Sequence, residues 1–377
     1  MDLKIYNVMN EKQDDIFRKL QQHLDKLPVG FPATESGIEI RILKHLFTPE
    51  QAQIALTLGF YPNNLKQLGR KLKQYTLEEL EQRLDEMYFA GLINRGVREE
   101  NGTEVKYYTS APLAIGMFEY QLNRLTPEFF KDVEDYFDQG FLDEYNKTGI
   151  PQIRTIPIEQ TLDHEQPISS YDDLKHVIET IGGPIAVAEC ICRKGTDLLG
   201  EPCKKTELRE SCFSFRTAAK VYIEKGLGRE ISKEEALKIL GKAQEDGLVL
   251  QPGNSQRPMN ICTCCGCCCG VLSHQNKLEE PAQFFATNYY ANVNPDDCIG
   301  CGTCEERCNM NAIHMEDAIA VVNLARCIGC GACVPTCTSE AIKLYKKDHE
   351  IVPPKNTIET YLTIMDKKAE LARVGKN

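Results

Sequence analysis

Apolar residues recur every three or four positions through the first third of the chain, and this spacing predicts helices. The first such stretch is marked by Ile16, Leu20 and Leu24. Further helices are predicted between residues 40 and 75. Thr76 then begins another helix as its N-cap, with Glu79 placed to complete a capping box, and this helix ends at Gly91.

Beyond Gly91 the pattern changes to two short strands. Residues 92–95 form the first, residues 99–102 a tight turn, and residues 103–108 the return strand. Three helices followed by a two-stranded hairpin resemble a winged helix. We therefore predict a winged-helix-like helical domain over residues 1–120.

A winged helix that binds DNA places a basic recognition helix in the major groove. Here the helix in that position, residues 76–90, carries five acidic side chains against Arg83 alone, so it would repel phosphates. A basic group occurs in the preceding segment instead, at Lys66, Arg70, Lys71 and Lys73. We expect this domain to pack against protein and not to bind nucleic acid. A gel-shift with reduced and oxidised protein would test the alternative, a redox-sensing winged-helix regulator.

The rest of the chain is predicted as four further parts. Residues 121–165 form a connecting arm that runs extended from about Thr148 to Pro157. Residues 166–290 form a cysteine-rich domain. Residues 291–348 form a compact repeated module, and residues 349–377 a helical tail. The fold class is therefore α+β and multidomain.

The cysteine-rich domain combines strand and helix signals. Residues 185–188 form a buried strand that runs into Cys190. Helices are predicted over 213–224 and 232–244, the second with Ser232 as its N-cap. A short strand follows at 248–250.

Composition narrows the class of protein. Of 377 residues, 42% are hydrophobic and 26% are charged, which is ordinary for globular domains. The net charge of −11 argues against broad attraction to nucleic acid or an anionic membrane. We see no apolar run near the ~18 residues of a membrane span and no signal peptide. We expect a cytoplasmic protein without a membrane span.

All 18 cysteines lie between Cys190 and Cys337. A disulfide scaffold would need a secreted, usually small domain. Without a secretory signal, grouped cysteines favour metal binding or redox chemistry.

The module over 291–348 contains the pattern C-x2-C-x2-C-x3-C twice, and thiolates at this spacing hold iron–sulfur clusters. The first run is Cys298, Cys301, Cys304 and Cys308, and the second is Cys327, Cys330, Cys333 and Cys337. One tight loop supplies three corners of a cubane, and the fourth cysteine of each run is expected to open a helix and bind the other cluster. The predicted ligand sets are Cys298, Cys301, Cys304 with Cys337, and Cys327, Cys330, Cys333 with Cys308.

This module resembles the bacterial two-cluster [4Fe–4S] ferredoxins. A zinc site at these cysteines would be expected to show two separate C-x2-C pairs. Here each C-x2-C pair is followed by a third and a fourth cysteine at the ferredoxin spacing, which argues against zinc. The module departs from the family in one respect, because Asn309 and Thr338 stand where proline usually follows the fourth cysteine. The whole chain is similar to the multidomain 4Fe–4S ferredoxin-type proteins of anaerobes, which implies iron–sulfur electron transfer but supplies no substrate.

Ten cysteines lie upstream of the module, in two groups. The first is Cys190, Cys192, Cys203 and Cys212. Four thiols among Lys and Arg residues suit a third [4Fe–4S] cluster, with zinc or mixed ligation with the second group as alternatives. The second is Cys262, Cys264, Cys265, Cys267, Cys268 and Cys269. These six exceed the needs of one cubane, so they can supply a fourth cluster or divide between two sites.

Two further hypotheses concern what such a protein does. The favoured one is an electron-transfer protein that passes electrons through two clusters, and one or two more, to a redox partner protein. The alternative is a reductase whose active centre is a cluster or a reactive dithiol near Cys262–Cys269. No flavin or nicotinamide fingerprint accompanies it. The sequence names no catalytic residue and no oligomeric state.

Overall fold

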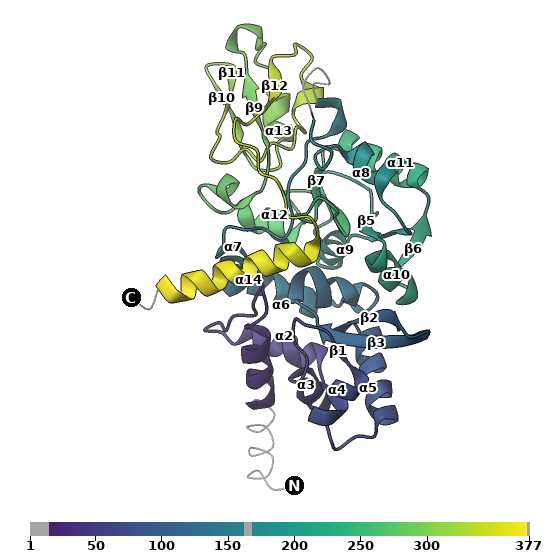
Figure 1. Cartoon of the computed structure of the whole chain (residues 1–377). Helices are drawn as coiled ribbons and strands as arrows, with labels where there is room; N and C mark the ends of the chain where they lie inside the picture. Colours follow the sequence, from purple (N-terminus) through teal and green to yellow (C-terminus); the bar gives the residue numbers. More distant parts are fainter. Residues whose placement is uncertain (1–14, 162–167, 375–377) are drawn as a thin grey trace. The chain divides into compact units, whose positions relative to one another are not determined.

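The computed structural model describes residues 15–161 and 168–374 (Figure 1). The chain divides into two compact units, Met1–Tyr145 and Asn146–Asn377. The division falls inside the arm predicted over 121–165. Both units combine helices and strands, as the predicted α+β class requires.

The first unit contains a group of short helices followed by a β-hairpin. A helix over residues 15–24 precedes them. The helices are α2 (Ile38–Leu46), α3 (Pro49–Ala55), α4 (Leu65–Lys71) and α5 (Leu77–Phe89). The strands are β1 (Asn63–Asn64), β2 (Ile93–Glu100) and β3 (Thr103–Ser110), and the sheet order is β1-β3-β2.

Side-chain caps fix where these helices begin. Thr76 accepts a hydrogen bond from the backbone N–H of Glu79, whose carboxylate bonds back to the Thr76 N–H, so the predicted capping box is confirmed. Thr48 forms the same arrangement with Gln51 at α3. Because each box satisfies two otherwise unpaired backbone donors, the short helices start at defined residues.

Aromatic side chains close the core of the first unit. α6 (Pro127–Tyr136) packs against α2, and the chain continues through α7 (Leu142–Asn146) across the division between the units. Phe129, Phe130 and Tyr136 are fully buried on α6. These side chains therefore make one face of α6 part of the core.

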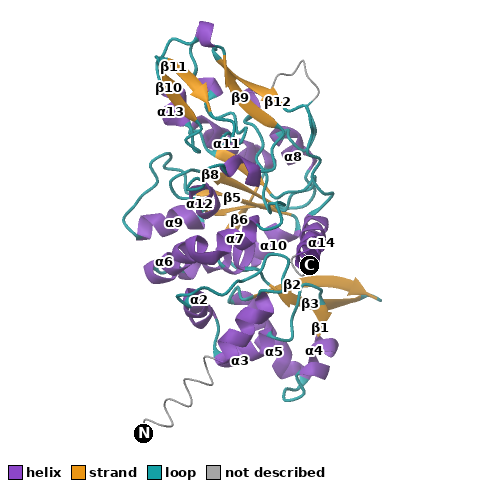
Figure 2. Cartoon of the chain, turned by 90° about the vertical axis from the view of Figure 1, so that its left-hand side faces the viewer, coloured by secondary structure: helices purple, strands orange, loops and turns teal. Residues whose placement is uncertain are grey.

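A five-stranded antiparallel sheet forms the centre of the second unit, with the order β6-β4-β5-β8-β7 (Figure 2). The strands are β4 (Ile185–Glu189), β5 (Glu210–Phe215), β6 (Gly228–Ile231), β7 (Val249–Pro252) and β8 (Asn260–Cys264). Its covering helices include α8 (Leu174–Thr180), α10 (Thr217–Glu224) and α11 (Lys233–Glu245). Ser232 caps α11 as predicted.

The helix predicted over 213–224 is wrong in its first part. Residues through Phe215 belong to β5, and only Thr217–Glu224 is helical. Phe213 and Phe215 are completely buried in the core beneath the sheet. Every second residue of a strand faces the same side, as Phe213 and Phe215 do here. The helix α10 begins two residues later, so the pattern of the strand reads in the sequence as part of that helix.

Residues 150–158, which we call the strap, run along the edge of the sheet and contact the segment before the module. Ile153 pairs with Gly253 and Ile156 with Leu250, both at β7 or its end. Arg154 pairs with Ala286 in the segment before the module. Arg154 is also buried in an ion pair with Asp172. This strap ties the sheet to the start of the module within the second unit.

The module contains two pairs of short antiparallel strands. β9 (Tyr289–Val293) pairs with β12 (Ile342–Lys346), and β10 (Ile313–Glu316) pairs with β11 (Ile319–Val322). α12 (Gly270–Gln275) precedes it, α13 (Thr303–Arg307) lies inside it, and α14 (Thr357–Val374) follows. The predicted helical tail is therefore present. None of the described helices is long and apolar enough to cross a membrane.

Candidate metal centres

Two hollows in the module are each lined by four cysteines. Cys298, Cys301, Cys304 and Cys337 line what we call the first cluster site. Cys308, Cys327, Cys330 and Cys333 line the second cluster site. Each hollow thus takes three thiols from one sequence run and the fourth from the other.

Glycine is required where the loops turn around the hollows. Gly300 and Gly329 have φ angles of 70° and 65°, in the left-handed region. A Cβ at Gly300 would lie 2.4 Å from the carbonyl oxygen of Ala318, and one at Gly329 would lie 2.1 Å from that of Tyr289. No other residue fits these positions without displacing the backbone.

Backbone N–H groups point at the sulfurs, as thiolate ligands require. Ala320 donates to Cys298 Sγ at 3.5 Å, Ala312 to Cys308 Sγ at 3.2 Å, and Ala291 to Cys327 Sγ at 3.4 Å. Burial raises the pKa of Cys330 to about 12. Without a metal this cysteine is a neutral thiol, so bound iron must supply the positive charge that makes it a ligand. The residues present fit a cubane in each hollow.

The fourth cysteine of each run does not open a helix, and that expectation is wrong. Cys308 ends α13, and Cys337 ends a short 3-10 helix over Val334–Thr336. The contacts of Asn309 explain why proline does not follow Cys308 in this chain. Its buried side chain donates to the Gly247 carbonyl at 2.7 Å and accepts from the Gly266 N–H at 3.0 Å. A proline could make neither bond.

The ten upstream cysteines are grouped differently from their order in the sequence. Cys203 joins three cysteines of the second group, at Cys265, Cys267 and Cys268. We call these four the four-cysteine site. The remaining six are Cys190, Cys192, Cys212, Cys262, Cys264 and Cys269. The sequence left open that the second group of cysteines divides between two sites, and the structure has this arrangement. The first group is also divided, because Cys203 lies apart from Cys190, Cys192 and Cys212.

The other six cysteines form what we call the six-cysteine row. Cys212 on β5 and Cys262 on β8 are paired across the sheet, and Cys264 follows on the same face of β8. Cys190 directly follows β4, and Cys269 caps α12. Neighbouring thiols interact in the order Cys190, Cys192, Cys269, Cys264, Cys262 and Cys212.

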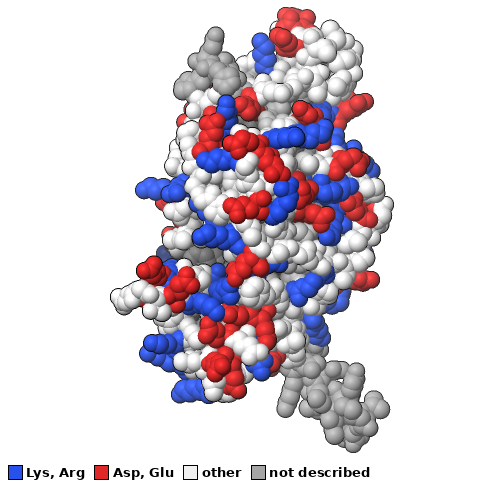
Figure 3. All heavy atoms as spheres, turned by 90° about the vertical axis from the view of Figure 1, so that its right-hand side faces the viewer, with Lys and Arg blue, Asp and Glu red and all other residues white. Residues whose placement is uncertain are grey.

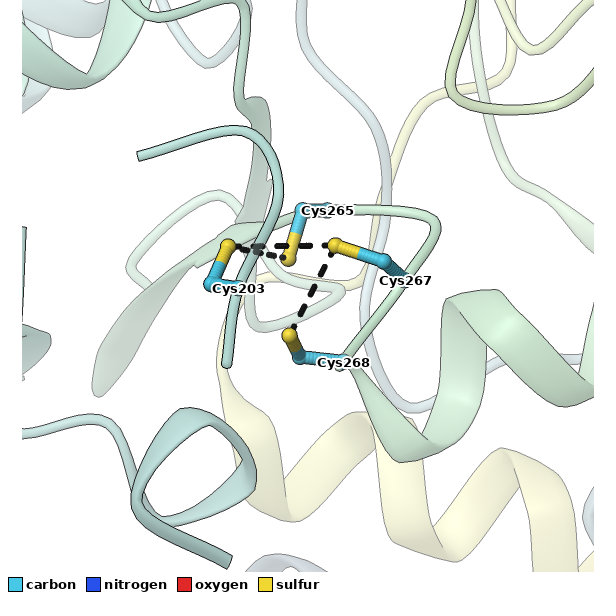
Figure 4. Close-up of side chains that lie close together, drawn as sticks. All are labelled: Cys203, Cys265, Cys267 and Cys268. Carbon is cyan, nitrogen blue, oxygen red and sulfur yellow. Dashed lines mark hydrogen bonds between the residues drawn. The ribbon is translucent and has the colours of Figure 1, made fainter. Parts of the chain in front are cut away.

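The four-cysteine site is much tighter. Cys203 Sγ lies 3.6 Å from Cys265 Sγ and 3.8 Å from Cys267 Sγ, and Cys267 Sγ lies 3.6 Å from Cys268 Sγ (Figure 4). All four sulfurs lie within 4.8 Å of one another. Cys203 is on the loop after α9 (Ile191–Leu198), and the other three are on the turn between β8 and α12. Only Cys267 is exposed.

Arg193 is a buried cation beside both upstream groups. Its side chain is 1% exposed, and it donates to Ser211 Oγ at 2.6 Å and to the Thr263 carbonyl. Burial lowers the pKa of Arg193, but the attraction of thiolates at Cys190, Cys265 and other cysteines of both groups raises it above its ordinary value. This arginine therefore offsets the negative charge of both sites.

The metal centres share apolar cores. One core contains Cys264 and Cys269 of the row and is packed against Cys308, Cys327 and Cys330 of the second cluster site. Another core joins cysteines of both cluster sites, among them Cys304 and Cys333. The order in space is thus first cluster site, second cluster site, six-cysteine row.

Sequence reasoning missed the contacts of Asn309 and of Cys203. The partners of Asn309 lie 43 and 62 residues away, and those of Cys203 lie more than sixty residues away. The signal for Cys203 was the surplus of thiols in the second group, which left mixed ligation open. Arg193 was expected among the cations that offset charge at the first group, and the structure adds its contact with the second group.

Comparison with protein families supports the module alone. Residues 290–338 match a family described as a 4Fe-4S dicluster domain, and this range contains all eight module cysteines. No match was found among curated proteins or among solved structures. The chain is therefore an iron–sulfur protein with a ferredoxin-type dicluster domain, and that match covers a small part of its 377 residues.

Proposed function

We propose that this protein transfers electrons through two [4Fe–4S] clusters in the module and one further cluster in the six-cysteine row. The proposal rests on how the cysteines are grouped and on the apolar core that connects the groups. Each hollow is lined by four cysteines, and an apolar core joins the second hollow to the row. When bound, cubanes supply one-electron chemistry, and the protein supplies spacing, hydrogen bonds to sulfur and exclusion of water.

The first cluster site is the proposed point of contact with a redox partner. Cys301 is exposed, and the neighbouring Ile299 is 66% exposed. Asp296, Asp297 and Glu305 surround it as exposed acids. An apolar contact within an acidic rim suits a partner with a basic docking face. The partner is a redox protein of unknown identity.

Anaerobic purification followed by redox titration tests the proposal. Each cluster should be reduced and reoxidised reversibly by one electron, and neighbouring reduced clusters should show magnetic interaction in EPR spectra. Cys301→Ser should alter the first cluster, and Cys330→Ser the second, while the other signal persists. Protein that binds iron but does not cycle reversibly would contradict electron transfer.

A row cluster would be ligated by four of the six thiols, and variants identify them. Cys212→Ser and Cys190→Ser change opposite ends of the row. Loss of iron in one variant but not the other would show which end binds. If neither change lowers the iron content, the total iron of the full-length protein decides the outcome. About twelve irons place the cluster on the four inner thiols of the row, and about eight show that the row holds no cluster.

We also propose that the first unit, winged-helix-like in its element order, binds a partner protein and not DNA. The element order α3, β1, α4, α5, β2, β3, with the sheet order β1-β3-β2, supports the winged-helix interpretation. Glu78, Glu79 and Glu86 remain exposed acids on α5. Lys and Arg side chains are interspersed with Asp and Glu over the face drawn in Figure 3. A gel-shift at several salt concentrations should show no tight, sequence-specific duplex binding. Nanomolar specific binding would reverse this assignment.

A further inference from the structure

The sulfur spacing of the four-cysteine site identifies the kind of metal that fits it. Zinc binds thiolates at about 2.3 Å, and in a tetrahedron this bond length places neighbouring sulfurs about 3.8 Å apart. The three measured separations are 3.6, 3.8 and 3.6 Å. Four thiolates at this spacing surround a single ion.

A cubane does not fit the same four sulfurs. It presents four irons, and each iron takes a different cysteine, so the sulfurs stand farther apart than those sharing one ion. Among the residues that the structure describes, the four-cysteine site is the one group of three or more metal-ligating side chains whose ligand atoms all lie within 4.8 Å. The eight module cysteines are not gathered in this way.

The surroundings of the site are those of a closed structural metal centre. Cys203, Cys265 and Cys268 are 8%, 1% and 2% exposed and pack against Ala243 and Leu248. The backbone N–H of Lys205 bonds to the sulfur of Cys203, and that of Lys204 bonds to the sulfur of Cys267. Such N–H contacts to sulfur orient thiolate ligands and offset their charge.

We propose that Cys203, Cys265, Cys267 and Cys268 bind one zinc ion, separate from every iron–sulfur cluster of the protein. The ion joins the loop after α9 to the turn between β8 and α12. Cys265 directly follows Cys264, and Cys268 directly precedes Cys269, so zinc also fixes two members of the six-cysteine row. The proposal does not depend on electron transfer, because it concerns a metal without redox chemistry.

Metal analysis of the full chain, purified without oxygen, tests the proposal. We expect about one zinc per chain, and X-ray absorption at the zinc edge should show four sulfurs at about 2.3 Å. Cys267→Ser changes the exposed ligand and is the variant least expected to disturb folding. It should lower the zinc content about fivefold or more and leave about eight module irons. The matched control, Cys212→Ser, should retain its zinc.

The other outcomes overturn the proposal. A single iron in place of zinc, lost in Cys267→Ser, would make the site a mononuclear iron centre. Loss of about four irons in that variant, with no zinc in the wild type, would show a cubane instead. Zinc that survives Cys267→Ser and disappears in Cys212→Ser would place it in the row. Failure of electron transfer alone changes none of these readings.

Discussion

At the scale of single residues, charge compensation by Arg193 links the upstream sites. A buried cation stabilises the more negative, reduced state of a nearby cluster. Arg193→Gln removes the charge and keeps a polar amide in the shortened side chain. We expect the potential of the row cluster to fall by roughly 60 mV, the shift that corresponds to about 1.4 kcal/mol for one electron.

Redox titration with EPR detection measures that shift. Arg193→Lys keeps the charge and should move the potential less than Arg193→Gln. The module clusters serve as internal references, because their potentials should stay nearly constant. Equal shifts of all clusters, or none, would show that Arg193 has a purely structural role.

Asn309 joins the module to the cysteine-rich turn. Asn309→Ala leaves the buried Gly247 carbonyl without its donor and Gly266 without its acceptor. We expect a local loss of about 1–3 kcal/mol, measured by native-state hydrogen exchange of the turn containing Gly266. Asn309→Asp keeps the acceptor for Gly266 but places a carboxylate oxygen against the Gly247 carbonyl, so it should lose at least as much. Unchanged exchange in both variants would refute this role.

Residue types and spacing predicted which module thiols lie together much better than which upstream thiols do. Local spacing brings together the first three thiols of each run, and the repeat of the run predicted that the fourth comes from the other copy. Cys203 meets Cys265 and Cys267 across more than sixty residues of sequence. No local pattern encodes a contact of that kind, and the proposed sites there rest on the structure.

At the scale of elements, Asp85 fastens α5 to the hairpin. Its carboxylate accepts from Arg95 at 2.9 Å, Lys106 at 2.6 Å and Tyr108 at 3.0 Å. In the sequence Asp85 counted only as one of five acids that oppose DNA. Its partners lie on the two strands, and the N-cap signals that predicted α5 do not report such contacts.

Asp85→Ala should loosen this helix and hairpin. It removes one acceptor from three donors, including the buried Tyr108, at a cost of about 1.5–3 kcal/mol. Hydrogen exchange should accelerate over residues 77–110 and stay unchanged in the second unit. Glu78→Ala, an exposed acid on the same helix, is the matched control. Faster exchange in the control as well would remove the special role of Asp85.

The pKa of Asp85 gives the same contact a pH dependence. Burial raises the pKa, but hydrogen bonds from Lys106, Arg95 and Tyr108 outweigh it and lower the pKa below its ordinary value. The carboxylate therefore stabilises the first unit above about pH 4, and this stabilisation is lost as pH falls through the lowered pKa. Asp85→Asn should flatten the acid dependence of exchange protection over residues 77–110, relative to wild type.

At the scale of the whole molecule, the module depends on the rest of the second unit. The strap residue Ile158 donates to the Cys330 carbonyl at 3.1 Å, and Arg326 donates to Asn276 and nearby carbonyls. A fragment of about residues 285–348 lacks these partners. It should still assemble about eight irons but release them to a chelator faster than residues 146–377. Equal release rates would show that the module is self-sufficient.

The proposed electron path needs at least one cluster beyond the two of the ferredoxin-type module. Quantitative iron and sulfide analysis with EPR spin counting, on full-length protein and on Cys212→Ser and Cys190→Ser prepared without oxygen, measures the number of clusters. We expect about twelve irons per chain in the full-length protein, about eight in each variant whose changed thiol is a ligand, and both module signals unchanged in both variants. About eight irons in the full-length protein as well would refute the third cluster.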